Sequence, residues 1–221
     1  MPSKSRISIA GWISESTTDP VTQAQWIRWV LKPLLWGAGF VPLGWLVYAA
    51  VTDNLTADPV KAITHFTGRT ILVILFLTLS ITPLRRLTGF SGLVKVRRLV
   101  GLFAFFYAVL HLLIYLAFDR GFVFTELGED ILKRPYITVG FTAWLILLTL
   151  AVTSPIAMVK RLGGKRWQAI HRLVYVAPVL GVIHFTWAQK KDIRLPLIYA
   201  AILGAIFLWR LGSRVRRRAP G

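Results

Sequence analysis

The sequence has no cysteine among its 221 residues, and it is poor in acidic residues and in histidine. The lack of cysteine excludes disulfide bonds, thiolate chemistry, cysteine-ligated iron–sulfur clusters and covalent haem attachment through a CxxCH motif. Nine Asp and Glu residues stand against 27 Lys and Arg, so the formal net charge is +18. A chain this basic could bind nucleic acid. Its cations, however, lie between long apolar runs, which is typical of a polytopic membrane protein and does not favour a nucleic-acid partner.

Long apolar runs are the main positive feature, since 55% of the residues are hydrophobic. Six runs are long enough to cross a membrane as helices. The sequence therefore predicts an all-α membrane protein, a six-transmembrane-helix bundle. We expect three parts: an N-terminal tail (1–30), a transmembrane domain (31–211) and a basic tail (212–221). The predicted spans are 34–51, 66–84, 99–118, 137–158, 171–187 and 195–211, with a kink at Ser154-Pro155 in the fourth.

Lys and Arg are concentrated in alternate connectors of this bundle. They gather in the N-terminal region, in the loops after the second and fourth spans, and in the C-terminal tail. Positively charged loops stay on the cytoplasmic side of a membrane. We therefore expect both termini to be cytoplasmic, which agrees with an even number of spans.

Two of the four histidines, His111 and His184, lie deep in apolar runs. An ionisable side chain inside a membrane span is costly and indicates a functional site. His111 follows the start of its span by twelve residues and His184 by thirteen, and both spans begin on the cytoplasmic side, so both rings lie about 18–20 Å deep. Two imidazoles at one depth favour a bis-histidine b-type haem. The alternative is that each is a buried, hydrogen-bonded histidine.

The other polar groups near the span ends have more than one interpretation. His171 is thirteen residues before His184, roughly 20 Å along a helix, so the two cannot bind the same metal. At the corresponding inner depth of the third span stand Arg97 and Arg98, which would either anchor the topology or hold an anionic group such as phosphate. His65 and Arg69 lie at the outer rim, and we expect them near the haem propionates or simply at the interface.

These features resemble a known family. The segments ADPVKAITHFTGRT, VRRLVGL and KRPYITVG, together with His111, His171 and His184, are similar to the MsrQ (YedZ) family, the haem-binding membrane subunit of the bacterial methionine sulfoxide reductase system. That family is related to the ferric-reductase-like transmembrane domain.

The resemblance implies a function. It implies that electrons pass from the quinone pool of the inner membrane through b-type haem, with FMN as a further cofactor, to MsrP. MsrP is a periplasmic molybdopterin subunit that reduces methionine sulfoxide in oxidised periplasmic proteins. It also implies that His111, His171 and His184 are haem-ligand candidates and that Arg97 and Arg98 serve flavin binding or electron input. One or two haems remain possible.

Two other functions remain open. A stand-alone transmembrane reductase of ferric ion or oxygen would need a nucleotide-binding domain, and the sequence has no GxGxxG-type segment. A cofactor-free transporter or assembly factor would be indicated by carboxylates within the spans, but all nine acidic residues lie outside the six runs. The leading hypothesis is an electron-transfer subunit of an oxidoreductase complex rather than its catalytic subunit.

Overall fold

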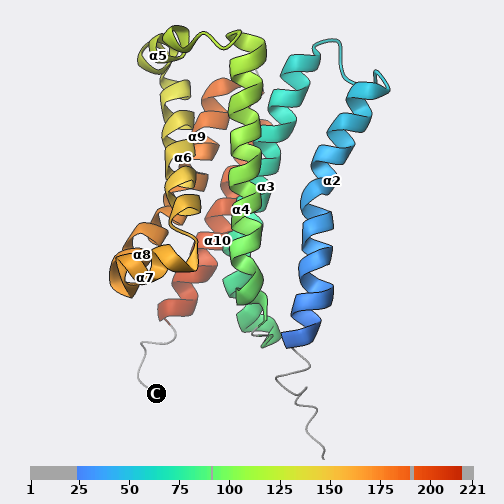
Figure 1. Cartoon of the computed structure of the whole chain (residues 1–221). Helices are drawn as coiled ribbons and strands as arrows, with labels where there is room; N and C mark the ends of the chain where they lie inside the picture. The colour runs from blue at the N-terminus through green and yellow to red at the C-terminus, as the bar shows by residue number, and fades with distance from the viewer. Residues whose placement is uncertain (1–23, 91, 190–191, 216–221) are drawn as a thin grey trace, which may run out of the picture.

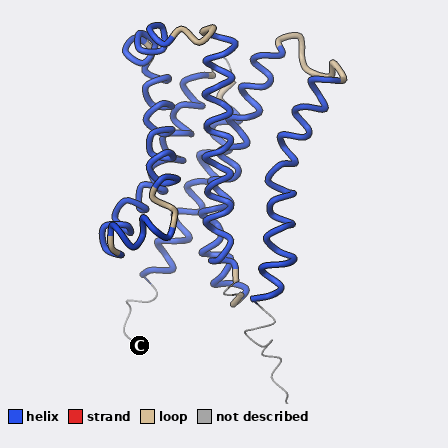
Figure 2. The backbone as a smooth tube through the Cα atoms, in the orientation of Figure 1, coloured by secondary structure: helices blue, strands red, loops and turns tan. Residues whose placement is uncertain are grey.

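The computed structural model describes residues 24–90, 92–189 and 192–215, and within these ranges it contains helices and loops but no strand (Figures 1 and 2). Six segments are long and apolar enough to cross a membrane, which confirms the predicted bundle: Ala24–Val51, Pro59–Thr88, Leu93–Asp119, Pro135–Val152, Gly164–Ala188 and Arg194–Ser213. The start of the first span and the end of the last lie at the same end of the bundle (Figure 1). Residues 1–23 and 216–221 of the two predicted tails lie outside the described residues.

Some spans are single helices and others are joined from shorter pieces. The main helices are α2 (Lys32–Val51), α3 (Pro59–Thr88), α4 (Leu93–Ile114), α6 (Pro135–Val152), α9 (Val176–Ala188) and α10 (Arg194–Val215). The π-helical turn η2 (Ile27–Leu31) precedes α2, and a second one, η3 (Tyr115–Asp119), follows α4. The fifth span joins α8 (Gly164–His171), the 3₁₀ turn η4 (Arg172–Tyr175) and α9. Two short helices, α5 (Phe124–Lys133) and α7 (Ile156–Leu162), lie outside the spans.

The fourth span is shorter than predicted. Its helix α6 ends at Val152, and α7 begins separately at Ile156 after Pro155. A proline disfavours helical geometry in the residue before it, so Ser154-Pro155 ends the helix instead of kinking it. The polar Lys160 and Arg161 then fall on α7 and not at the end of a continuous span.

The fifth span is interrupted between His171 and His184 by η4, and a single arginine holds this break in place. Arg210 of α10 donates one hydrogen bond to the carbonyl of Leu79 in α3 at 2.8 Å and another to the Tyr175 hydroxyl. Pro83 lies four residues after Leu79 and has no N–H to offer that carbonyl. The guanidinium therefore satisfies a backbone group that would otherwise be costly within a membrane, and it ties three spans together.

Helix α2 is attached to the bundle by Tyr107 of α4, which is completely buried. The Tyr107 hydroxyl donates to the Gly39 carbonyl at 2.7 Å and accepts from the Leu43 N–H at 3.1 Å. These two backbone groups are four residues apart, and a regular α-helix joins groups at this spacing by a direct backbone hydrogen bond. Pro42 lies inside this turn, so the hydroxyl bridges the backbone where the helix is weakest.

Tyr107→Phe is expected to lower the free energy of unfolding by about 1–3 kcal/mol, because two partly buried backbone groups of α2 lose their shared partner. Thermal unfolding of the detergent-purified protein measures this. Tyr48→Phe, which alters an exposed tyrosine of α2, serves as the control and should leave the midpoint unchanged. Equal midpoints for the two variants would contradict the bridging role.

Candidate metal centre

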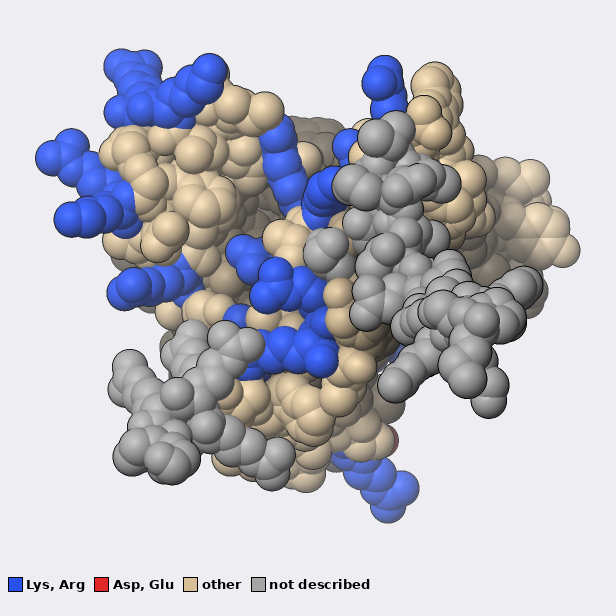
Figure 3. Space-filling model, turned by 90° about the horizontal axis from the view of Figure 1, so that it is seen from below, with Lys and Arg blue, Asp and Glu red and all other residues tan. Residues whose placement is uncertain are grey.

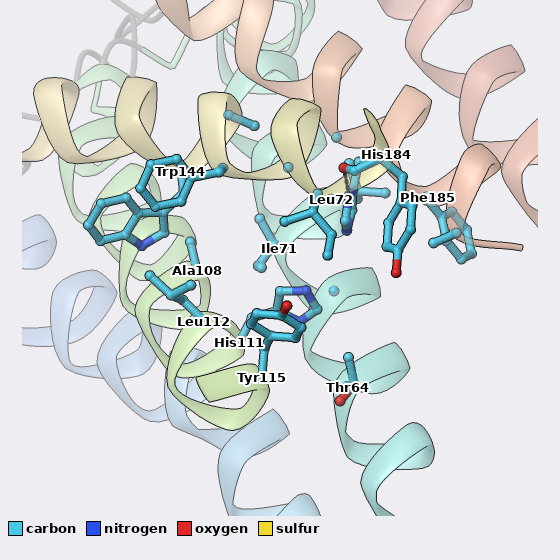
Figure 4. Close-up of a pocket in the computed structure, with 18 of the residues that line it drawn as sticks. Thr64, Ile71, Leu72, Ala108, His111, Leu112, Tyr115, Trp144, His184 and Phe185 are labelled. Atoms are coloured by element: carbon cyan, nitrogen blue, oxygen red, sulfur yellow. Dashed lines mark hydrogen bonds between the residues drawn. The ribbon is translucent and has the colours of Figure 1, made fainter. Parts of the chain in front are cut away.

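Two imidazoles face each other between α4 and α9. The ring centres of His111 and His184 are 6.3 Å apart, and the ring planes are inclined by 88° (Figure 4). An imidazole nitrogen binds a transition metal at about 2 Å and its ring centre lies roughly 1 Å farther away, so two rings on opposite sides of one metal have centres about 6 Å apart. The spacing therefore fits a single metal held axially by both rings, the arrangement of a bis-histidine haem.

Both rings are fixed through their Nδ1 atoms. The His184 Nδ1 donates to the Tyr136 carbonyl at 2.6 Å. The His111 Nδ1 lies 3.0 Å from the Thr67 hydroxyl, and that hydroxyl itself donates to the Ile63 carbonyl at 2.9 Å, so it accepts from His111. Each histidine thus carries its proton on Nδ1 and presents an Nε2 lone pair. Metal-binding histidines are typically oriented in this way by their second ring nitrogen.

Glycines make room for the two rings. A Cβ at Gly140 would lie 2.6 Å from the His184 Nδ1, and one at Gly68 would lie 3.3 Å from the His111 Cε1. Gly181, which also lines the space between the helices, would meet Leu72 at 2.8 Å. On each of the three helices α3, α6 and α9, a glycine therefore leaves space for the rings and the cavity.

The histidine pair lines a cavity of about 400 Å³ between α3, α4, α6 and α9. Its inner part is formed by apolar side chains such as Leu75, Leu147 and Ala177, and its outer end by polar and charged ones. Thr64 and Trp144 lie in its wall (Figure 4), and the Thr64 Oγ1 and the Trp144 Nε1 are buried without a hydrogen-bond partner among the residues that the structure describes. Unsatisfied buried donors are rare in folded proteins, so the cavity is suited to a large, mostly apolar group with a polar end.

The predicted outer residues His65 and Arg69 lie at the polar end of this cavity. The Gln189 side-chain amide donates to the His65 Nδ1 at 3.2 Å, and the Arg69 Nε donates to the His65 carbonyl at 3.3 Å. Arg134 also lines this end. A hydrogen bond with the Tyr136 side chain, and the neighbouring Asp130 carboxylate, raise the pKa of Arg134 above its ordinary value, so this side chain stays charged.

His171 is not part of this cavity, although the other three histidines line it. Its ring stacks on Trp167 with centres 4.0 Å apart, and its Nε2 lies 3.1 Å from the Thr153 hydroxyl. Trp167 donates to the Thr153 carbonyl at 2.9 Å, so the three side chains form one cluster at the opposite end of the bundle. Arg97 interacts electrostatically with His171. The charge of Arg97 thus acts on His171, but the other three histidines line the cavity and none stands beside His171.

The chain resembles known membrane proteins over most of its length. Residues 66–182 match the family model described as a ferric reductase like transmembrane component. The protein-methionine-sulfoxide reductase heme-binding subunit MsrQ of Herminiimonas arsenicoxydans is 48% identical over 184 residues, which cover 82% of this chain and 84% of that protein. The MsrQ subunits of Xanthomonas oryzae pv. oryzae strain MAFF 311018 and Bordetella pertussis are 46% and 44% identical, over 86% and 85% of this chain and 89% and 92% of theirs.

Gly140→Ala is expected to displace the His184 ring and lower the thermal unfolding midpoint, because the added Cβ would lie closer to the ring than atoms approach in folded proteins. The cost of such overpacking is about 1–3 kcal/mol. Gly44→Ala is the matched control, since a Cβ there meets nothing within 4 Å. If both variants unfold at the same temperature, Gly140 is not needed to seat the ring.

Proposed function

Because the chain belongs to the MsrQ family of ferric-reductase-like membrane proteins, we propose that it is the haem-binding, electron-transferring subunit of a protein-methionine-sulfoxide reductase system. The 6.3 Å spacing of the His111 and His184 rings carries this proposal. A b-type haem bound there would supply reversible one-electron chemistry. In this role the chain would transfer electrons to the catalytic subunit of the complex.

Each part of the cavity has a role in holding the haem. His111 and His184 would supply the two nitrogen ligands, and Thr67 together with the Tyr136 carbonyl keeps both rings in the ligating tautomer. The apolar inner wall would exclude water from the bound metal. Arg69 and His65 lie at the polar end, where charged groups of the cofactor would remain.

The path of the electrons follows from the family. We assign the electron source to the quinone pool and the acceptor to MsrP, the periplasmic molybdopterin subunit that reduces methionine sulfoxide in oxidised periplasmic proteins. FMN is the second cofactor, and Arg97 and Arg98 at the end opposite the cavity mouth are its binding candidates, with His171 nearby. His171 is retained as a candidate ligand of a second haem.

The orientation in the bacterial inner membrane follows from charge. The end of the bundle at which α2 begins carries many Lys and Arg side chains (Figure 3). Among them are Arg85 and Arg86 at the end of α3, and Lys160 and Arg161 at the end of α7. By the positive-inside rule this end is cytoplasmic, so the cavity mouth faces the periplasm. The ferric-reductase-like domain then comprises residues 31–211, between an N-terminal tail (1–30) and a basic tail (212–221).

His111→Ala and His184→Ala are each expected to abolish the bis-imidazole haem spectrum, because either change removes one of two axial ligands. His171→Ala should leave most of that signal. Reduced-minus-oxidised visible spectra with haem quantification on purified protein measure all three. Equal loss from His171→Ala would contradict the pairing of His111 with His184.

Replacing Arg97 and Arg98 together by Ala is expected to lower the flavin content of the purified protein without lowering its haem content, since the two cations would no longer bind the FMN phosphate. Flavin released by denaturation is measured by fluorescence. The control replaces Lys160 and Arg161, two cations of α7 at the same end, and should change neither cofactor. An unchanged flavin content in the Arg97 and Arg98 variant would contradict a role in FMN binding. These arginines would then only fix the orientation of the chain in the membrane.

A further inference from the structure

The short helices α7 and α8 project from the bundle near the end at which α2 begins (Figure 1). They are seven and eight residues long, and none of these residues, all of which the structure describes, is buried. Isolated helices shorter than about 12–15 residues are marginally stable in water. Packing within the described chain therefore does not account for the order of these two helices, and an additional interaction must stabilise them.

A glycine turn between the two helices brings two pairs of cations together. Lys160 and Arg161 lie near the end of α7, and Lys165 and Arg166 lie at the start of α8. Gly163 between them has φ 73° and ψ 153°, a backbone conformation that is essentially restricted to glycine. The segment KRLGGKR thus places four exposed cations around one corner of the chain, which we call the α7–α8 corner.

No carboxylate balances these four cations within the part of the chain that the structure describes. The ion pairs found there join Glu129 and Asp130 to other cations. Every described Asp and Glu lies in a connector at the opposite end of the bundle. Figure 3 looks at the basic end, and blue side chains project from its left side, where α7 and α8 lie in Figure 1. The α7–α8 corner therefore presents uncompensated positive charge to its surroundings.

The cations of α8 point away from the face by which this helix is attached. Trp167 donates a hydrogen bond to the Thr153 carbonyl, and the His171 Nε2 lies 3.1 Å from the Thr153 hydroxyl, so this face is tied to the end of α6. With 3.6 residues per turn, Lys165 and Arg166 lie roughly 120–140° around the helix from that face. Both side chains are exposed and available to a ligand outside the bundle.

Helix α7 combines its cations with an exposed apolar side chain. Ile156 at its start is 66% exposed, and Lys160 and Arg161 follow within the same helix. Helices with this combination typically lie at a membrane interface, where apolar side chains enter the acyl boundary and Lys and Arg reach the headgroups. Among the groups found at that interface, the phosphates of anionic phospholipids complement the charge of the α7–α8 corner.

We propose that the α7–α8 corner binds the phosphate headgroup of an anionic phospholipid in the membrane leaflet at this end of the bundle, and that the bound lipid orders both helices. Clusters of four or more Lys and Arg directly beside a membrane span attract anionic lipids in this way. The proposal does not depend on the haem, since none of the four cations lines the histidine cavity.

Native mass spectrometry of the full-length, detergent-purified protein tests the site, with phosphatidylglycerol as the anionic lipid and phosphatidylcholine as the neutral one. Wild-type protein should bind phosphatidylglycerol more tightly. Replacing Arg161 and Lys165 together by Gln should weaken that binding about thirtyfold, which is about 1 kcal/mol for each cation removed, and leave phosphatidylcholine binding unchanged. Because both side chains are exposed, the variant should keep the fold.

The control variant replaces Arg85 and Lys95 by Gln, which removes the same number of exposed charges from α3 and α4 at the same end of the bundle. It should bind phosphatidylglycerol as the wild type does. Equal weakening in the two variants would overturn the proposal, since diffuse positive charge would then explain the binding. Equal affinity of the wild type for the two lipids would also overturn it, and would leave the α7–α8 corner available to an acidic protein.

Hydrogen–deuterium exchange tests whether the lipid orders the two helices. The wild-type protein is placed in nanodiscs of phosphatidylcholine with and without phosphatidylglycerol. The amides of residues 156–171 should exchange more slowly when the anionic lipid is present, and the Arg161 and Lys165 variant should lose this difference. Identical exchange of the wild type in the two membranes would contradict ordering by the lipid.

Discussion

The structure depends on one constraint, the burial of two imidazoles at matching depth in an apolar bundle. Each ring is tolerated there because its Nδ1 has a fixed acceptor, the Thr67 hydroxyl for His111 and the Tyr136 carbonyl for His184. These acceptors come from α3 and α6, whereas the rings come from α4 and α9. The four helices around the cavity must therefore be correctly aligned with one another for both hydrogen bonds to form. Glycines at positions 68 and 140 then allow the helices to approach closely enough to hold the rings.

Two further polar contacts within the spans support this arrangement. Arg210 satisfies the Leu79 carbonyl left without a partner by Pro83 and holds the 3₁₀ turn that separates the two histidines of the fifth span. Tyr107 similarly bridges the backbone of α2 beside Pro42. At both of these irregular segments a side chain from a neighbouring helix bonds the backbone or the turn, as an environment without water requires.

Much of this organisation was predictable from the sequence, because membrane spans and buried histidines are signalled by composition and spacing. The six spans and the pairing of His111 with His184 across two helices follow from counting residues. The end of α6 at Val152 was missed, since a proline near a span end can either kink or stop a helix. The roles of Thr67 and Gly140 depend on which faces meet, which one sequence does not reveal. Asp130 lies in a polar connector between two apolar runs, where the sequence gives no sign of burial, and only the packing of α5 shows it buried.

The central claim is that His111 and His184 together hold one haem in the outer half of the bundle. Electron paramagnetic resonance of the oxidised, purified wild-type protein tests it most directly, because the ferric signal reports both the number of axial imidazoles and the angle between their planes. Rings inclined by 88° should give a low-spin ferric signal of high anisotropy. A high-spin ferric signal, which a single axial histidine would produce, or a sample with no haem signal would contradict the account.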